Sequence, residues 1–151
     1  MVLGGTFDQL HIGHRKLLTA AVTIATERLT VGVMSDKYIQ NKSKALKEFI
    51  EPAHERGAKV EAFLRSLRPT GIEFKVVLID DPFGPTITEP NFDAIVVSTE
   101  TLAGGVAVNK ERRKRGLRRL VVVAITRNDP ASLSSTALRR WKKERGDQGR
   151  L

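Results

Sequence analysis

The sequence predicts a doubly wound α/β fold: one domain over residues 1–151, with a five-stranded parallel sheet and helices on both faces. Apolar runs of strand length alternate along the chain with segments of helical periodicity, which is the pattern of parallel α/β proteins. The chain also opens with a short apolar run, a glycine pair and then apolar residues at helical spacing. Its 151 residues, 40% of them hydrophobic, are enough for one core.

The first half of the chain is expected to supply two strands and two helices. Met1 to Leu3 reads as the end of a buried strand, and the helix after it is expected to reach about Arg28. Leu29–Met34 is the second strand, and Ser35–Lys37 follows at its carboxyl edge, where ligands collect in open α/β sheets. Pro52 can begin a helix, whose predicted apolar face consists of Val60, Phe63, Leu64 and Leu67.

The second half is expected to complete the sheet. Three strands are predicted over Ile72–Ile79, Asp93–Ser98 and Leu120–Ile125, the last of them fully buried. The loop Asp80–Thr86 is rich in proline and glycine, and such a shaped loop is often a substrate wall. Ser134–Thr136 can cap a last helix that reaches about Arg145.

Charge and composition restrict the possible classes of protein. The net charge of +9 is concentrated in Lys110–Arg119, with a net +6, and Arg139–Leu151, with a net +4. Such segments could bind nucleic acid, but a polyphosphate substrate accounts for local charge equally well. The longest apolar run, Leu120–Ile125, is far shorter than a membrane span, and the opening residues do not resemble a secretion signal. With no cysteine in the chain, a cytoplasmic protein without disulfides is expected.

The opening segment has the properties of an anion site. Gly4 and Gly5 would let the chain turn sharply and let a phosphate approach the backbone. The free N–H groups and positive dipole end of the following helix would point at that phosphate. His11 and His14 are one helical turn apart, so both can face it from the same side.

At these residues the chain resembles the nucleotidyltransferase superfamily that has an HxGH motif, through Gly4–Asp8 followed by His11–His14. Leu133–Arg139 is similar to the superfamily's second motif, ISSTxxR. There the hydroxyls and N–H groups at a helix start, with Arg139 one turn later, could grip triphosphate oxygens. The resemblance implies a Rossmann-like nucleotidyltransferase fold.

Three further stretches resemble the archaeal and eukaryotic phosphopantetheine adenylyltransferases. They are the block from Val97–Thr101 through Asn109 to Arg112 and Arg113, the loop Asp81–Thr86, and Lys42 with Glu51, Pro52 and Arg56. The family more often has Gly-Ala where this chain has Gly104 and Gly105, which is a minor departure.

The resemblance implies transfer of the adenylyl group of ATP to 4′-phosphopantetheine, giving dephospho-coenzyme A and pyrophosphate. His14 is expected at the transferring α-phosphoryl group, His11 at the departing phosphates, and Lys42 at the incoming phosphate, which makes these the catalytic candidates. The expected ATP-binding residues are Gly5, Thr6, Phe7, His11, Gly13, His14, Ser134, Ser135, Thr136 and Arg139. The expected acceptor-binding residues are Thr6, Lys42, Arg56, Asp81, Gly84 and Thr86.

The resemblance also implies partners and a cofactor. Mg²⁺ is expected to arrive with ATP and to bind largely through water, without a metal site made of side chains. The expected partners are ATP and phosphopantetheine, with no nucleic acid and no membrane, and the expected state is a monomer. Two alternatives stay open: a superfamily enzyme with another acceptor, such as nicotinamide mononucleotide or flavin mononucleotide, and a basic nucleic-acid-binding module.

Overall fold

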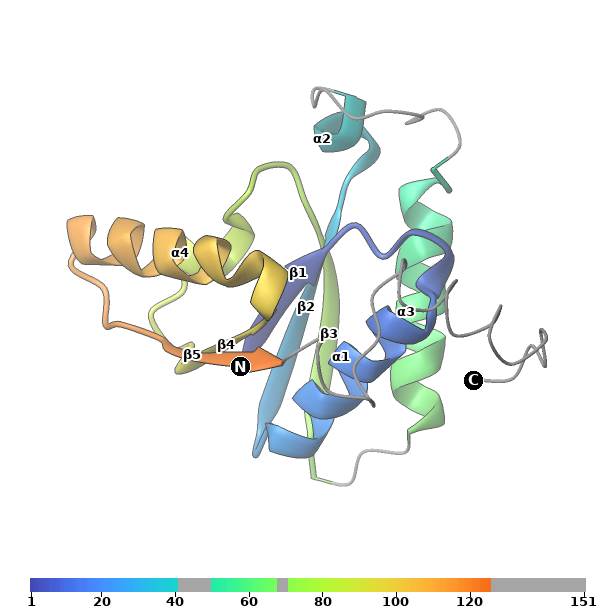
Figure 1. Ribbon diagram of the computed structural model, residues 1–151, viewed down its shortest axis with the longest axis horizontal. Coiled ribbons are helices and arrows are strands. Elements are labelled where there is room, and N and C mark those ends of the chain that lie inside the picture. The colour runs from blue at the N-terminus through green and yellow to red at the C-terminus, as the bar shows by residue number, and fades with distance from the viewer. Residues whose placement is uncertain (41–49, 68–70, 126–151) are drawn as a thin grey trace.

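The computed structural model describes residues 1–40, 50–67 and 71–125, which are coloured in Figure 1. This part of the chain contains five strands: β1 (Val2–Gly5), β2 (Arg28–Met34), β3 (Glu73–Ile79), β4 (Ala94–Ser98) and β5 (Val121–Ile125). All neighbouring strands pair in parallel, in the order β3-β2-β1-β4-β5. The five-stranded parallel sheet predicted from the sequence is therefore confirmed.

Helices cover both faces of this sheet. They are α1 (Ile12–Ile24), α2 (Asp36–Gln40), α3 (Ala53–Ser66) and α4 (Leu102–Lys114), with short 3₁₀ turns η1 (Asp8–Leu10), η3 (Gly84–Ile87) and η4 (Thr99–Thr101). Figure 1 shows α1 and α3 on one face and α4 on the other. In the ranges that the structure describes, no helix has the length and apolar character that crossing a membrane requires.

Each face has its own hydrophobic core, because successive residues of a strand point to opposite sides. The core under α1 and α3 includes Leu18, Val31 and Val60, and the smaller core under α4 includes Val97 and Val108. Strands buried on both faces read as continuous apolar runs. That is why the sequence indicated their positions well.

The glycine pair does not form the turn that the sequence predicted. Gly4 and Gly5 are the last two residues of β1, and the chain turns after them. At Gly5 an added Cβ would come within 3.3 Å of the Phe7 ring, so the glycine makes room for that ring to fold back on the strand. The left-handed backbone lies at Phe7, Gln9 and Leu10 instead.

One helix end and the burial of one strand also differ from the prediction. The first helix ends at Ile24 rather than near Arg28, because Ala25 adopts an extended conformation that starts the approach to β2. The predicted full burial of the last strand was wrong: among the described residues β5 lies at the edge of the sheet, and Val121 is 65% exposed. An apolar run alone does not distinguish an edge strand from a central one.

The strand order places a crevice at the carboxyl edge of the sheet. The chain moves outward from β1 through β2 to β3, and then returns to the other side of β1 to form β4. Ligands of open α/β sheets bind where the order reverses in this way, outside the carboxyl ends of the two strands. Here β1 leads into Thr6 and β4 ends at Ser98, so the strand order predicts a ligand site beside these two strand ends.

Helix α4 has two adjacent glycines that give a test of the packing. A Cβ added at Gly104 would meet no atom within 4 Å, whereas one at Gly105 would lie 3.2 Å from Val122. We therefore expect Gly104→Ala to stabilise the protein by about 0.5–1 kcal/mol, because alanine loses less backbone entropy in a helix. Urea unfolding midpoints measure this. Gly105→Ala is the matched control and should give no gain; an equal gain from both would contradict the packing of α4 on β5.

Candidate active site

The two motif histidines lie at the start of α1, directly after the turn that follows β1. Their rings are stacked, with centroids 3.7 Å apart and planes 20° apart. His11 is the N-cap residue of the helix, and its Nδ1 accepts a hydrogen bond of 3.0 Å from the N–H of Gly13. An imidazole nitrogen that accepts must be unprotonated, so neutral His11 has its proton on Nε2 and can donate it to a phosphate oxygen.

The histidines follow a turn with unusual backbone angles. The φ angles of Phe7, Gln9 and Leu10 are 56°, 55° and 27°, and none of these residues is glycine. Such conformations cost about 1–2 kcal/mol each and persist only where the surroundings hold them. The apolar anchors are the side chains of Phe7 and Leu10, both buried, and the Phe7 ring centroid lies 5.3 Å from that of His14.

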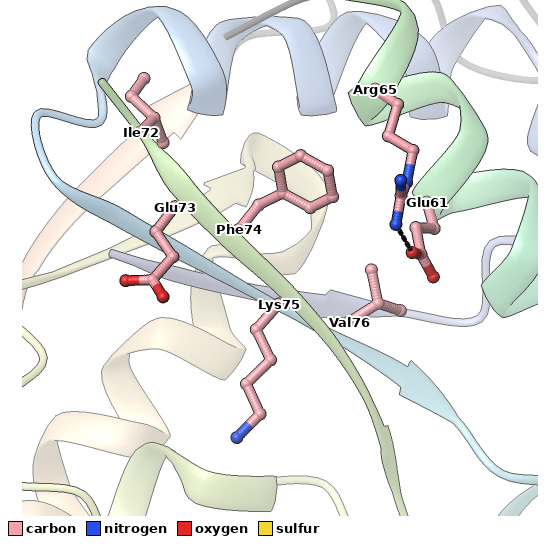
Figure 2. Close-up of a pocket in the computed structure, with 7 residues that line it drawn as sticks. All are labelled: Glu61, Arg65, Ile72, Glu73, Phe74, Lys75 and Val76. Atoms are coloured by element: carbon pink, nitrogen blue, oxygen red, sulfur yellow. Dashed lines mark hydrogen bonds and ion pairs between the residues drawn. The ribbon is translucent and has the colours of Figure 1, made fainter. Parts of the chain in front are cut away.

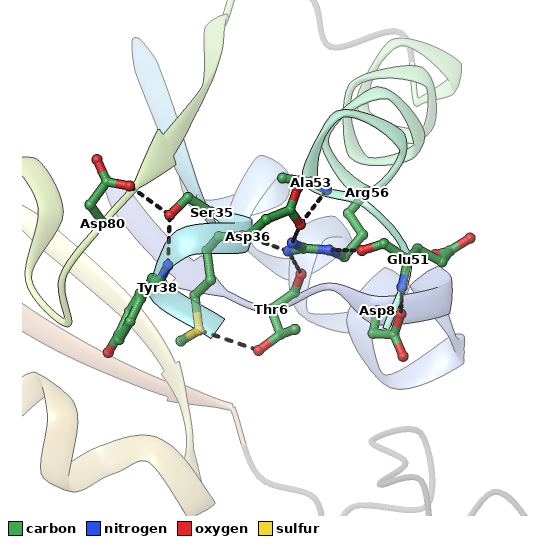
Figure 3. Close-up of polar contacts among 10 residues, drawn as sticks. Thr6, Asp8, Ser35, Asp36, Tyr38, Glu51, Ala53, Arg56 and Asp80 are labelled. Atoms are coloured by element: carbon green, nitrogen blue, oxygen red, sulfur yellow. Dashed lines mark hydrogen bonds and ion pairs between the residues drawn. The ribbon is translucent and has the colours of Figure 1, made fainter. Parts of the chain in front are cut away.

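Arg56 of α3 holds the strand ends beneath this turn, as Figure 3 shows. Its side chain is 0% exposed, and Nη1 donates to the carbonyls of Thr6, at 2.8 Å, and Met34, at 2.7 Å. Nε donates to the carbonyl of Glu51, and Nη2 pairs with Asp36 at 3.1 Å. Because these protein acceptors occupy four of its five N–H groups, the structure argues against the predicted direct contact between Arg56 and the acceptor phosphate.

Glu51 and Asp8 join the turn to the segment before α3 through reciprocal bonds to the backbone. The N–H of Gln9 donates to Glu51 Oε1 at 2.8 Å, and the N–H of Glu51 donates to Asp8 Oδ1 at 3.0 Å. The other carboxylate oxygen of Glu51 pairs with Lys59. The hydrogen bond from Lys59 is the main cause that holds the pKa of Glu51 below its usual value, with burial opposing it.

The carboxyl ends of β2 and β3 are tied to each other and to α3. The hydroxyl of Ser35 donates to Asp80 at 2.6 Å and accepts from the N–H of Tyr38. Asp36 accepts from the N–H of Ala53, the first residue of α3. Ser35–Lys37 therefore lies at the carboxyl edge of the sheet, as predicted. There Ser35 joins the ends of β2 and β3, and Asp36 joins the end of β2 to the start of α3.

The loop predicted as a substrate wall is rigid for identifiable reasons. Asp81 Oδ1 accepts from the N–H groups of Phe83 and Gly84, at 2.9 and 2.6 Å. Gly84 has a φ of 55°, and an added Cβ would lie 2.6 Å from Ile79, so only glycine fits there. Thr86 is buried, and its hydroxyl donates to the carbonyl of Phe83.

Arg112 of α4 fastens the far side of this loop. It is fully buried and donates to the carbonyls of Thr86, at 2.6 Å, Glu89, at 2.9 Å, and Arg118, at 2.6 Å. Burial, together with the nearby charge of Arg118, lowers its pKa. Arg112 belongs to the block that resembles the phosphopantetheine adenylyltransferases, and in the structure it supports the loop from the protein interior.

An apolar slot of about 200 Å³ lies between the sheet, this loop and α4. One wall is formed by Pro82, Phe83, Pro85 and Thr86, and the other includes Gly104 and Val108. Its floor includes Gly4 and Gly5, which leave the backbone accessible. The slot thus adjoins the strand that leads into the histidine turn.

A second hollow lies on the outer flank, between α3 and the edge strand β3. Figure 2 shows Phe74 and Val76 pointing toward α3, while Glu73 and Lys75 point to the other face of the strand. Glu61 and Arg65 on α3 form an exposed ion pair at its rim. This hollow is on the side of the sheet rather than at the carboxyl ends of the strands. It is therefore a weaker candidate for the substrate site than the apolar slot.

Several predicted site residues lie outside the described residues. Lys42 belongs to residues 41–49, and Ser134, Ser135, Thr136 and Arg139 belong to residues 126–151, as does the predicted last helix. The structure brings together the others from the opening motif: Gly5, Thr6, Phe7, His11, Gly13 and His14.

Sequence reasoning assigned no role of their own to Asp8, Asp36 and Glu51. All three accept backbone N–H groups from segments far away in the chain, at separations of 43, 17 and 42 residues. No local pattern marks such long-range contacts. For Arg56 and Arg112 a signal existed, because each is four residues from a buried valine on its helix, Val60 and Val108.

Comparison with known proteins agrees with this site. The profile of the cytidylyltransferase-like family matches residues 2–141, which include the histidine turn and all five strands. The chain belongs to this family. The nucleotidyltransferase superfamily predicted from the two motifs is thereby confirmed.

Individual relatives are similar to this chain over most of its length. An uncharacterized protein of Schizosaccharomyces pombe is 42% identical over 91% of this chain, but the chain spans only 46% of that protein's length. The phosphopantetheine adenylyltransferase of Methanothermobacter thermautotrophicus is 38% identical over 93% of this chain and 82% of its own.

A solved structure of a protein of unknown function from Archaeoglobus fulgidus superimposes with a TM-score of 0.67 and 31% identity. The superposition covers 83% of this chain and 96% of the other. That protein therefore has a fold similar to the one described above.

Proposed function

We propose that this chain transfers the adenylyl group of ATP to 4′-phosphopantetheine, giving dephospho-coenzyme A and pyrophosphate. The observation that supports this best is the stacked pair His11 and His14 at the start of α1, beside the crevice where the strand order reverses. The similarity to an archaeal phosphopantetheine adenylyltransferase supports the choice of reaction.

The reaction needs positioning and charge stabilisation more than acid–base chemistry. A phosphate oxygen of the acceptor attacks the α-phosphorus of ATP, the new P–O bond forms, and the bond to the β-phosphate breaks as pyrophosphate leaves. The attacking phosphate is already an anion, so it needs no general base. In the proposal, His14 donates to the α-phosphoryl oxygens and His11 Nε2–H to the departing phosphates.

Backbone groups of the opening motif complete the proposed phosphate cradle. In the proposal, the N–H groups at the start of α1, including that of His14, and the backbone of Gly5, Thr6 and Phe7 contact the phosphates, since they lie where β1 passes into α1. Ser134, Ser135, Thr136 and Arg139 are proposed to hold the triphosphate from the other motif. Lys42 is proposed as the cation at the acceptor phosphate, since Arg56 is engaged inside the protein.

The apolar slot suits the acceptor's long, neutral arm. Its proline, phenylalanine and glycine lining offers apolar contact with few charges, and its loop wall is fixed by Arg112. In the proposal Thr86 borders the arm, whereas Asp81 and Gly84 act by shaping the loop.

Mg²⁺ is proposed to enter with ATP. The carboxylates at the histidine turn, Asp8 and Glu51, accept hydrogen bonds from protein N–H groups, so the fit favours an ion held by triphosphate oxygens and water. Bound there, the ion would neutralise charge on the leaving pyrophosphate. In the proposal, His11, His14 and Arg139 donate hydrogen bonds to the phosphate oxygens that the ion does not contact.

The proposal further describes a cytoplasmic monomer that binds no nucleic acid. The basic segment Lys110–Arg119 ends α4, at the opposite end of the strands from the crevice. Of its cations, Arg112 is buried and Arg115 pairs with Glu111. A nucleic-acid-binding module would instead give oligonucleotide affinity that falls steeply with salt.

Turnover of the purified chain with each candidate acceptor tests the proposal. We expect pyrophosphate release from ATP with phosphopantetheine, and far lower kcat/KM with nicotinamide mononucleotide or flavin mononucleotide. Omitting the acceptor is the control, because hydrolysis of ATP would also release phosphates. A higher kcat/KM with nicotinamide mononucleotide would assign the chain to another branch of the superfamily.

A further inference from the structure

The histidine turn is stabilised by contacts that come from outside the two phosphate motifs. Three of its residues, Phe7, Gln9 and Leu10, have positive φ angles that they would not adopt unaided. Buried side chains hold Phe7 and Leu10, but Gln9 is exposed and has no such anchor. Its backbone N–H is fixed by Glu51 Oε1 at 2.8 Å.

The backbone of Glu51 also takes part in hydrogen bonds at this turn. Its own N–H donates to Asp8 Oδ1, and its carbonyl accepts Nε of Arg56, whose Nη1 reaches the carbonyl of Thr6. The turn is thus bonded at Thr6 to Arg56 of α3, and at Asp8 to Glu51, which precedes α3 (Figure 3). Gln9, on the other side of Phe7, is bonded to Glu51 as well. His11 follows Gln9 by two residues, so any shift of this turn would move the N-cap of α1.

We propose that Glu51 is a positioning residue for phosphoryl transfer: by accepting the N–H of Gln9 it holds the left-handed turn that aims His11 and His14 at the transferring phosphate. This inference rests on the proposed function for its kinetic consequences, but its structural consequences are independent of the substrate.

The structure offers three variants that separate the hydrogen bond from the charge. Glu51→Ala removes both the Gln9 contact and the Lys59 pair. Glu51→Gln keeps an amide oxygen that can accept the Gln9 N–H, and loses the negative charge. Lys59→Ala removes only the ion pair, on a side chain that is half exposed and worth little by itself.

We expect Glu51→Ala to lower kcat about tenfold, since small displacements of catalytic groups have effects of this size or larger. The dissociation constant of ATP, measured by calorimetry, should change much less. Glu51→Gln and Lys59→Ala should retain nearly wild-type kcat. Thermal unfolding of each variant establishes that it is folded, and Asp8→Ala, compared with Asp8→Asn, tests the reciprocal bond if Glu51→Ala does not fold.

Histidine NMR resonances give a readout that needs no turnover. The chain has three histidines, and we expect Glu51→Ala to shift the imidazole signals of His11 and His14, while Glu51→Gln and Lys59→Ala leave them in place. Unshifted signals in Glu51→Ala, or a loss of kcat in Glu51→Gln equal to that in Glu51→Ala, would overturn the positioning role. Shifted signals in a protein that adenylates no phosphopantetheine would refute the proposed function and leave the positioning role supported.

Discussion

Replacing His14 with alanine is expected to lower kcat for adenylyl transfer about 100-fold or more, because a preorganised donor to the transferring phosphoryl group is lost. The effect on the dissociation constant of ATP should be far smaller, since the proposed contacts of the triphosphate with the backbone N–H groups of α1 and with the second motif do not involve the His14 side chain. Steady-state kinetics combined with calorimetric titration of ATP separates the two quantities. A role in ground-state binding alone would instead weaken ATP affinity and leave kcat unchanged.

The third histidine of the chain is the matched control. His54 is exposed on α3, so His54→Ala should leave kcat unchanged. The His14 ring also packs against Phe7 and His11, so the fold of His14→Ala must be verified by its unfolding midpoint. A folded His14→Ala variant with wild-type turnover would remove His14 from the mechanism.

Arg56→Ala is expected to be the most destabilising of the substitutions considered, at about 3 kcal/mol. Its guanidinium donates to the part-buried carbonyls of Thr6, Met34 and Glu51, and its removal takes this donor from all three and opens a cavity below the turn. Urea unfolding gives the free energy directly. If Arg56 instead contacted the acceptor phosphate, the variant would keep its stability and raise KM for phosphopantetheine.

Arg65 on the same helix provides the comparison. Its side chain is 69% exposed, and it pairs with Glu61 one turn away. Exposed pairs of this kind contribute at most about 0.5 kcal/mol, so Arg65→Ala should be nearly neutral. Equal losses of stability in Arg56→Ala and Arg65→Ala would contradict the burial described here.

The sequence by itself determined the family, the parallel sheet and the place of the histidines. These depend on local signals: apolar runs for strands buried on both faces, and a motif whose residues are within ten positions of one another. The prediction of a His11 and His14 pair on one side of the helix agrees with the stacked rings. The proposed substrate roles of the site residues stay predictions.

The tertiary structure decided what supports the site. Arg56 was expected at the acceptor phosphate because it is a cation in a resembling motif, but it lies in the interior, on the same helix face as Val60 and Leu64. The sequence also predicted a turn formed by the glycine pair. In the structure the turn is formed by Phe7, Gln9 and Leu10, and Gln9 is hydrogen-bonded to Glu51, more than 40 residues away. Local propensity cannot predict a backbone that is stabilised in part by distant hydrogen bonds. In this protein the buried side chains of Phe7 and Leu10 and the hydrogen bonds from Glu51 and Arg56 together give the histidine turn its shape.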